Sequence, residues 1–241
     1  MFNTKIPLYG VFILVAIVLG SIVIYKNTEK FDFNKDEKTA LLLYALLGSI
    51  FGAKYITYFA NIQNYNEPFN FIKSGVSSYG AVIGIILIMV LYSKQYGKKF
   101  KDLIYIIISS IPLMYGIGKI GCFFAGCCYG IKYNGPLNVV YNYSNSAPNG
   151  ISLFPIQLLE AVAFIGIFIY VYIKTKNKRS SDTMIGKVII MYGVTKFLLD
   201  YLRMSHVGTI ITINQIISIA FVFIGIYLIL KNKCNYFKCC T

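Results

Sequence analysis

Three cysteines, a lysine and several glycines are concentrated in one stretch, GKIGCFFAGCCYG at residues 118–130. The thiols of Cys122, Cys127 and Cys128 could hold a metal, form a disulfide, act as a nucleophile or fill space. Their C-x4-CC spacing differs from the C-x2-C of a zinc half-site, so we expect no metal here. Three interpretations stay open, namely a disulfide, inert buried thiols and a Cys127 thiolate favoured by Lys119.

A second stretch, KFLLDYLR, places charges on an otherwise apolar segment. Lys196, Asp200 and Arg203 stand at i, i+4 and i+7, which predicts one polar stripe on a helix. A cation within a membrane segment costs about 2.5–3.5 kcal/mol and indicates a functional site by default. Cations in such a place suit an anionic head group, above all a phosphate.

Polar side chains also interrupt the other apolar segments. The segment FPIQLLE places Gln157 and Glu160 three residues apart, hence on one helix face. The set further includes Lys54, Ser77, Ser78, Tyr79, Lys119 and Gln215. We expect these groups to share one layer in the outer half of the bilayer, where four cations against two carboxylates leave a net positive pocket. The alternative is a set of unrelated snorkelling residues and polar contacts between helices.

The elements that must position these groups are membrane helices. The chain of 241 residues is 57% hydrophobic and 13% charged, which is typical of an integral membrane protein. Apolar runs occur at about 7–25, 39–61, 76–93, 103–118, 155–173, 184–202 and 209–230. Since a crossing takes about 20 helical residues, we predict an all-α polytopic protein with about seven transmembrane helices. The pair 76–93 and 103–118 is short, which admits a re-entrant or broken helix.

Basic clusters set the predicted orientation. They lie at 26–38, 94–101, 174–187 and 231–238, on alternate loops. The positive-inside rule then places the N-terminus outside and the C-terminus in the cytoplasm, and it explains the net charge of +14 without nucleic acid. We expect one transmembrane domain over 1–230 and a cytoplasmic Cys/Lys tail over 231–241. A transporter is disfavoured because the cytoplasmic half of each span is nearly unbroken apolar sequence.

Glycines are dense between residues 116 and 130. We expect them to break the helix so that backbone N–H groups face an anion. Close packing of helices through small residues is the alternative.

A series of short motifs extends along nearly the whole chain. They are LYG at 8–10, GAKY at 52–55, SSYGAVIG at 77–84, GKIGCFFAGCCYG, FPIQLLEA, YGVTKFLLDYLR and TINQIISI. In this order they resemble the motifs of the prolipoprotein diacylglyceryl transferase family. The resemblance implies a multi-pass protein of the bacterial plasma membrane with its site in the outer leaflet.

Members of that family transfer the diacylglyceryl group of phosphatidylglycerol to a lipobox cysteine of a prolipoprotein and release glycerol phosphate. By resemblance, the expected catalytic residues are Tyr79, Lys119, Cys127, Lys196 and Arg203. The expected phospholipid-binding residues are Lys54, Ser78, Gly80, Gly118, Gly121, Gln157, Glu160, Asp200 and Gln215. The implied partners are phosphatidylglycerol or a similar anionic phospholipid and a prolipoprotein or another acceptor, with no cofactor.

Several positions depart from the family pattern. Cys122 and Ala125 replace asparagines, and Cys127 replaces a glutamate. Tyr79 and Phe154 replace histidines, so Tyr79 and Cys127 could take over proton transfer only with shifted pKa values. The alternatives are therefore a divergent paralogue with another acceptor, or a non-catalytic phospholipid-binding membrane protein.

Overall fold

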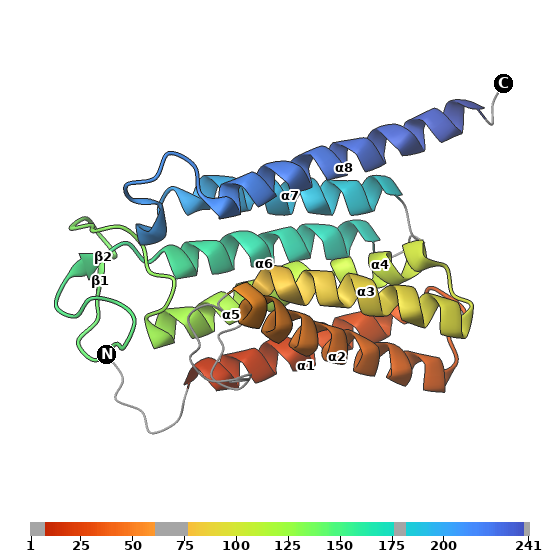
Figure 1. Cartoon of the computed structure of the whole chain (residues 1–241), viewed down its shortest axis with the longest axis horizontal. Helices are drawn as coiled ribbons and strands as arrows, with labels where there is room; N and C mark the ends of the chain where they lie inside the picture. Colours follow the sequence, from red (N-terminus) through yellow and green to blue (C-terminus); the bar gives the residue numbers. More distant parts are fainter. Residues whose placement is uncertain (1–7, 61–76, 176–181, 239–241) are drawn as a thin grey trace. The chain divides into compact units, whose positions relative to one another are not determined.

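The computed structural model describes residues 8–60, 77–175 and 182–238, most of which are helical (Figure 1). Its helices are α1 (Leu8–Thr28), α2 (Lys35–Ala60), α3 (Ser78–Tyr96), α4 (Phe100–Ile108), α5 (Ile111–Ala125), α6 (Ile156–Thr175), α7 (Asp182–Asp200) and α8 (Ile213–Lys238). The remaining elements are the strands β1 (Val139–Val140) and β2 (Ser152–Leu153) and the 3-10 helix η2 (Met204–His206).

Five helical stretches of the described residues are long and apolar enough to cross a membrane. They are Leu8–Thr28, Lys35–Phe59, Phe100–Ala125, Ile156–Thr175 and Ile213–Asn232. The apolar part of α3 is shorter, and the sequence of α7 includes Lys187, Lys196 and Asp200. The predicted class of a helical membrane protein is therefore confirmed. Residues 7, 61 and 76 of the predicted spans, and 239–241 of the predicted tail, lie outside the described residues.

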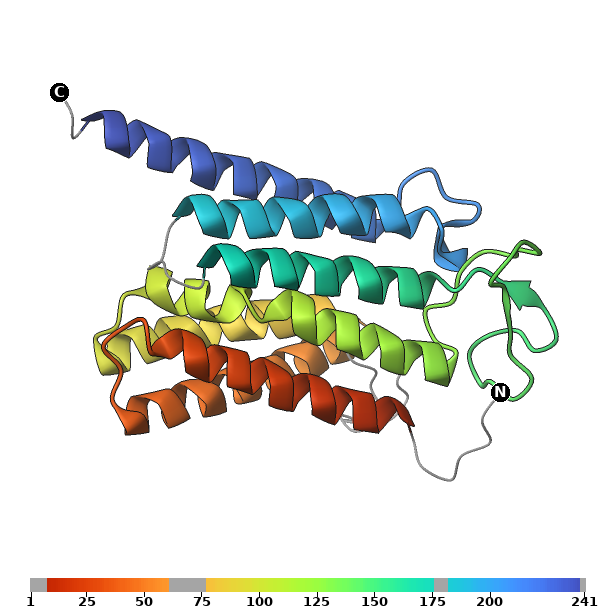
Figure 2. The same ribbon diagram turned by 180° about the vertical axis from the view of Figure 1, so that it is seen from behind.

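The chain divides into two compact units, one formed by residues 1–23 with 107–241 and the other by residues 24–106. In the first unit α5 contacts α6, α6 contacts α7, and α7 contacts α8. Figures 1 and 2 show these helices side by side from opposite directions. Helix α8 continues to Lys238, so the start of the predicted tail is helical.

Gly116 and Gly121 of α5 serve helix packing, and the prediction that the glycines within α5 break the helix is wrong. Helix α5 runs without interruption through Gly116 and Gly121. A Cβ on Gly116 would lie 2.9 Å from Ile165 Cγ1 of α6, and a Cβ on Gly121 would lie 3.0 Å from Phe12 Cβ of α1. Small residues here let neighbouring backbones approach, which is the packing alternative.

The interruption in this part of the chain precedes the glycines. Helix α4 ends at Ile108, Ser109 and Ser110 separate it from α5, and a proline occupies the first turn of α5. Proline lacks the N–H that would continue the helical ladder, and it fits the first turn of a new helix. The predicted span at 103–118 is thus a broken helix that extends to Ala125.

The second unit contains α2 and α3 packed against each other. Gly52 of α2 lies so close to α3 that a Cβ there would collide with the Gly80 carbonyl oxygen and would lie 2.7 Å from Gly84 Cα. Helix α3 begins after Ser77, whose hydroxyl accepts a hydrogen bond from the Gly80 N–H at 3.3 Å. The segment around Gly80 therefore takes part in close helix packing.

The segment between α5 and α6 is a compact loop rather than an extended one. Its strands β1 and β2 pair antiparallel, with Val139 opposite Leu153. Tyr141, Ala147 and Leu153 form a small buried core. Burial raises the pKa of Tyr141 to about 12, so its hydroxyl stays protonated and donates to the Phe123 carbonyl at 2.9 Å. The loop is thereby fixed to the end of α5.

Candidate active site

One buried carboxylate of the first unit connects two of the predicted cations. Glu160 of α6 is 1% exposed, and its Oε2 lies 2.7 Å from Lys119 Nζ of α5. Its Oε1 lies 3.5 Å from Lys196 Nζ of α7. Three helices therefore each contribute a charged side chain to one cluster. Isolated snorkelling does not explain this arrangement, because both lysines are less than a tenth exposed.

Tyr115 completes this cluster, although the sequence motifs did not single it out. Its hydroxyl accepts a hydrogen bond from Lys196 Nζ at 2.6 Å and donates one to Glu160 Oε1 at 3.2 Å. Its ring faces both ammonium groups, with Lys119 Nζ 5.2 Å and Lys196 Nζ 4.8 Å from the ring centroid. The signal that could have found it was spacing, because Tyr115 precedes Lys119 by four residues and so shares its helix face.

A second buried carboxylate, Asp200, lies at the end of α7. Arg203 Nη1 is 3.8 Å from its Oδ1, and Asn214 Nδ2 donates to the same oxygen at 3.3 Å. The Thr212 hydroxyl donates to Oδ2, and His206 Nδ1 lies 3.9 Å from that atom. Asp200 thus ties the loop that follows α7 to the first turn of α8 and orients Arg203.

The predicted helical stripe is wrong at Arg203. Helix α7 ends at Asp200, and Arg203 has extended backbone angles, with φ −93° and ψ 142°. The backbone around it pairs with the loop after α5, where the N–H of Ile131 donates to the Leu202 carbonyl at 3.1 Å. A short strand-like pairing with the loop after α5 and the ion pair with Asp200 therefore position Arg203, rather than helix α7 itself.

Electrostatics link Arg203 to the cluster around Glu160. Burial has the largest effect and opposes the charge of Arg203, but the acidic groups around it, Glu160 first and then Cys128, Tyr115 and Asp200, together outweigh burial and hold the pKa of Arg203 above its usual value. The site thus contains three buried cations, Lys119, Lys196 and Arg203, and two buried carboxylates. Their formal charges sum to +1, whereas the predicted pocket counted four cations because it included Lys54, a residue of the other unit.

Two buried amides have structural partners near these charges. Gln157 Nε2 donates to the Cys127 carbonyl at 2.9 Å, and Gln215 Oε1 accepts from the Thr212 N–H at 3.1 Å. Two buried donors, Gln215 Nε2 and Arg203 Nε, have no hydrogen-bond partner among the described residues. A buried donor without a partner costs about 1–3 kcal/mol, so an acceptor from a ligand would stabilise this region.

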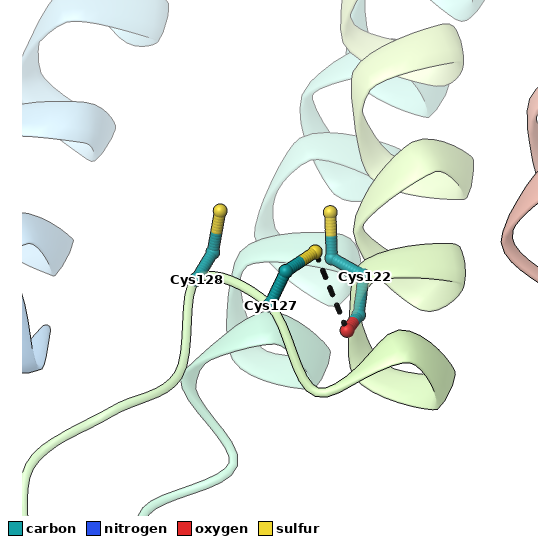
Figure 3. Close-up of side chains that lie close together, drawn as sticks. All are labelled: Cys122, Cys127 and Cys128. Carbon is teal, nitrogen blue, oxygen red and sulfur yellow. Dashed lines mark hydrogen bonds between the residues drawn. The ribbon is translucent and has the colours of Figure 1, made fainter. Parts of the chain in front are cut away.

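Cys127 and Cys128 lie in a tight turn after α5, close to Cys122 in the last part of that helix (Figure 3). Gly126 ends the helix in the left-handed region with φ 71°, and the Cys127 N–H donates to the Cys122 carbonyl at 3.1 Å. Cys128 also has a positive φ of 54°. The three thiols are free and lie within 4.8 Å of one another. The spacing argument against a metal is therefore invalid, because the turn folds the later cysteines back onto the earlier one.

The thiol with a lowered pKa is that of Cys128 rather than that of the predicted Cys127. Hydrogen bonds from Cys122 and Cys127, together with the charges of Lys119 and Arg203, lower the pKa of Cys128. At Cys127 the hydrogen bond with Cys122 lowers the pKa of the thiol. The hydrogen bond with Cys128 and burial raise it, and the net result is a raised pKa.

Of the other predicted residues, Lys54, Ser78, Tyr79 and Gly80 belong to the second unit, and Gly118 and Gly121 belong to α5. Lys54 is partly buried on α2, and the side chains of Ser78 and Tyr79 lie outside the described part of the chain. A Cβ on Gly118 would lie 3.8 Å from Ile13 Cδ1, which is ordinary contact, so nothing in the helix packing requires a glycine there. The roles of these residues in binding stay predictions.

Comparisons with known proteins agree with the resemblance in the motifs. The family model described as prolipoprotein diacylglyceryl transferase matches residues 1–231. The phosphatidylglycerol–prolipoprotein diacylglyceryl transferase of Clostridium tetani is 28% identical over 232 residues, which cover 94% of this chain and 93% of the relative. That of Clostridioides difficile is 28% identical over 247 residues, covering 98% and 96%. A relative from Clostridium perfringens with the same name, numbered 2, is 27% identical over 241 residues, covering 97% and 93%. The chain therefore belongs to the prolipoprotein diacylglyceryl transferase family.

Proposed function

We propose that this chain transfers the diacylglyceryl group of phosphatidylglycerol to the thiol of a prolipoprotein cysteine and releases glycerol phosphate. The names of its relatives support the reaction and its two substrates. The observation that carries the proposal within this chain is the buried, net positive group of Lys119, Lys196 and Arg203 around Glu160.

The reaction explains why such a group is needed. A thiolate attacks a glyceryl carbon, and the bond from that carbon to the phosphate oxygen breaks. Negative charge grows on the leaving phosphate, and preorganised cations in a water-poor site stabilise that charge. The unpartnered donors of Arg203 and Gln215 suit phosphate oxygens.

The remaining polar residues have supporting roles in this proposal. Glu160 and Asp200 hold the cations in place when no lipid is bound. Gln157 holds the turn at Cys127 through its carbonyl. Lys54, Ser78, Gly80 and Gly118 stay predicted phospholipid-binding residues, and Tyr79 stays the predicted candidate for proton transfer.

The topology belongs to the same proposal. We infer seven crossings, formed by α1, α2, α3, the α4–α5 pair, α6, α7 and α8, of which five are apolar enough by length and composition alone. The polar cluster explains why α7 is less apolar, since its Lys196 and Asp200 have buried partners. With basic loops in the cytoplasm, the N-terminus lies outside and the site faces the outer leaflet of the bacterial plasma membrane. Residues 1–230 then form one transferase domain, and 231–241 lie in the cytoplasm.

The test is glycerol phosphate release by the purified full chain, with labelled phosphatidylglycerol and a lipobox peptide. We expect release that depends on the peptide thiol, and a loss of about 100- to 1,000-fold in Lys196→Met, the magnitude typical of removing one preorganised donor. Lys187→Met on the same helix is the matched control, because Lys187 is exposed. Release without peptide modification would indicate another acceptor. Lipid binding without release by the wild-type chain would refute the enzymatic proposal.

A further inference from the structure

The three thiols at the end of α5 form a group that the phosphate site does not use. Cys122, Cys127 and Cys128 have sulfur atoms within 4.8 Å of one another, and no imidazole or carboxylate of the described residues belongs to that group. Figure 3 shows the three side chains close together, Cys122 on the helix and Cys127 and Cys128 on the segment that follows it. Since Cys128 is exposed, the group is accessible to solvent.

We propose that Cys122, Cys127 and Cys128 bind one thiophilic divalent ion such as Zn²⁺, with the fourth coordination position open to the acceptor thiol. The second half of this proposal rests on the proposed transfer to a thiol, whereas the first half stands on the geometry alone.

The distances fit such an ion after a small closure. Zinc–sulfur bonds of about 2.3 Å at tetrahedral angles separate two sulfur atoms by about 3.8 Å. The observed separations of up to 4.8 Å therefore require shifts of about 1 Å or less per side chain, within reach of cysteine rotamers. The contact that must rearrange is weak, because Cys127 Sγ lies 3.7 Å from the Cys122 carbonyl oxygen.

The backbone of the turn is already arranged to hold the three thiols. Gly126 takes a left-handed conformation that other residues rarely adopt, and a Cβ there would lie 2.9 Å from Ser144 Cβ. Cys128 has a positive φ, which costs about 1–3 kcal/mol and persists only where its surroundings enforce it. Gln157 is 1% exposed and donates to the Cys127 carbonyl, so a buried side chain fixes the middle of the turn.

The charges of the surroundings also suit the complex. Three thiolates and a divalent ion have a net charge of −1. Lys119 precedes Cys122 by three residues on α5 and so lies one turn away on the same face. Arg203 belongs to the segment that pairs with Gly130, two residues after Cys128. Two cations are therefore close enough to balance the complex.

An ion at this place would supply what transfer to a thiol requires. The acceptor thiol becomes the fourth ligand, and its proton is released to solvent because a metal-bound thiol is deprotonated. Its sulfur then forms a bond to the glyceryl carbon, and the carbon–oxygen electron pair leaves with the phosphate. The products are a thioether, which is a weak ligand, and glycerol phosphate with one more negative charge. One proton is released per turnover, which balances the reaction.

The test uses two variants of the full chain that each keep three cysteines. In Cys234→Ser/Cys239→Ser/Cys240→Ser only the turn has thiols, and in Cys122→Ser/Cys127→Ser/Cys128→Ser only the tail has them. Each detergent-purified protein, kept reduced with a phosphine, is loaded with Zn²⁺ or Co²⁺ and passed through a desalting column. We expect one ion per chain in the first variant and none in the second, with about three sulfur ligands by X-ray absorption.

A single substitution provides a control for the possibility that the triple variants fail to fold. Cys128 is exposed, so Cys128→Ser should fold as the wild type does, which thermal unfolding of the metal-free proteins checks. Its affinity for Zn²⁺ should fall by at least about 100-fold, since even indirect ligand supports are worth 10- to 100-fold. Equal metal binding by the two triple variants would overturn the metal site. A disulfide within the turn in protein isolated from cells would also overturn it.

A lipobox peptide tests the open position separately. Added to the Co²⁺-loaded protein, the peptide should increase the sulfur-to-cobalt charge-transfer absorption, and a peptide with serine in place of its cysteine should not. If transfer proceeds at the full rate after the ion has been removed, the role in acceptor activation is wrong. If the ion binds as expected but the chain releases no glycerol phosphate, the metal site stands and the proposed function falls.

Discussion

Glu160→Gln keeps the shape of the side chain that lies between two buried lysines but removes its charge. In the wild type Glu160 Oε2 lies 2.7 Å from Lys119 Nζ, and Oε1 lies 3.5 Å from Lys196 Nζ. The substitution raises the formal charge of the site from +1 to +2, because one buried carboxylate remains against three buried cations. Leaving a buried charge without its partner typically costs about 3–5 kcal/mol of folding free energy.

The assay is thermal unfolding of the purified chain in detergent. At roughly 2–4 °C per kcal/mol for a chain of this size, the unfolding temperature should fall by about 6–20 °C. Glu37→Gln is the control, since its pair with Lys98 spans a similar 2.8 Å but is partly exposed and worth at most about 1 kcal/mol.

Added lipid then tests whether the site binds phosphate. A ligand at 100 times its Kd stabilises the native state by about 2.7 kcal/mol. Phosphatidylglycerol should raise the unfolding temperature of Glu160→Gln by more than it raises that of the wild type, because the lipid phosphate replaces the missing negative charge. Phosphatidylcholine should raise the unfolding temperature of Glu160→Gln by less, because its choline ammonium group offsets the negative charge of its phosphate. If Glu160→Gln is as stable as Glu37→Gln, or if both lipids protect equally, the reasoning about this cluster is refuted.

Three further predictions concern the packing that positions the site. Gly116→Ala should destabilise the chain by about 1–3 kcal/mol, because its Cβ would lie 2.9 Å from an α6 side chain, whereas Gly166→Ala has nothing within 4 Å and should be neutral or stabilising in the same unfolding assay. Gly126→Ala should cost more than Gly97→Ala, since both have positive φ but only the first would place a Cβ against the Ser144 side chain; equal losses in unfolding would contradict that contact. Gln157→Leu removes the donor to the turn and should cost about 1–3 kcal/mol while speeding alkylation of the turn cysteines, as measured by mass spectrometry; an unchanged alkylation rate would show that this donor does not fix the turn.

Much of the site was predictable because charges in apolar segments are costly and so rarely accidental. Lys119, Glu160 and Lys196 stand out in the sequence on that ground, and they meet in one cluster. Tyr115 was not selected, because tyrosine is common in this chain and a buried hydroxyl has no comparable signal in the sequence. Only its position four residues before Lys119 marks it.

The errors arose where tertiary contacts decide local structure. A dense run of glycines is compatible both with a broken helix and with close packing, and the neighbouring α6 and α1 decide in favour of packing. The charge spacing from Lys196 to Arg203 fits a helix, but α7 ends at Asp200 because the next residues pair with the loop after α5. A regular spacing of charges predicts a shared helix face only for residues that belong to the helix.

At the cysteine turn, the spacing along the sequence hides a cluster of side chains that the fold brings together. Ligand spacing along a chain assumes a known loop geometry, and C-x4-CC matches none of the usual zinc patterns. Gly126 and the positive φ of Cys128 fold the turn so that the three sulfur atoms meet. A glycine is the usual residue at a left-handed helix end, but the positive φ of Cys128 could not be read from its residue type.

The most direct test of the account is the mass of the acceptor peptide after incubation with the wild-type chain. With phosphatidylglycerol, the peptide should gain one diacylglyceryl group on its cysteine, and the yield should fall about 100-fold or more in Arg203→Met, where the buried guanidinium beside Asp200 is lost. Phosphatidylcholine in place of phosphatidylglycerol, or serine in place of the peptide cysteine, should abolish the gain. An unmodified peptide with the wild-type chain, or an equal gain with Arg203→Met, would contradict the claim that this cation cluster supports transfer to a thiol.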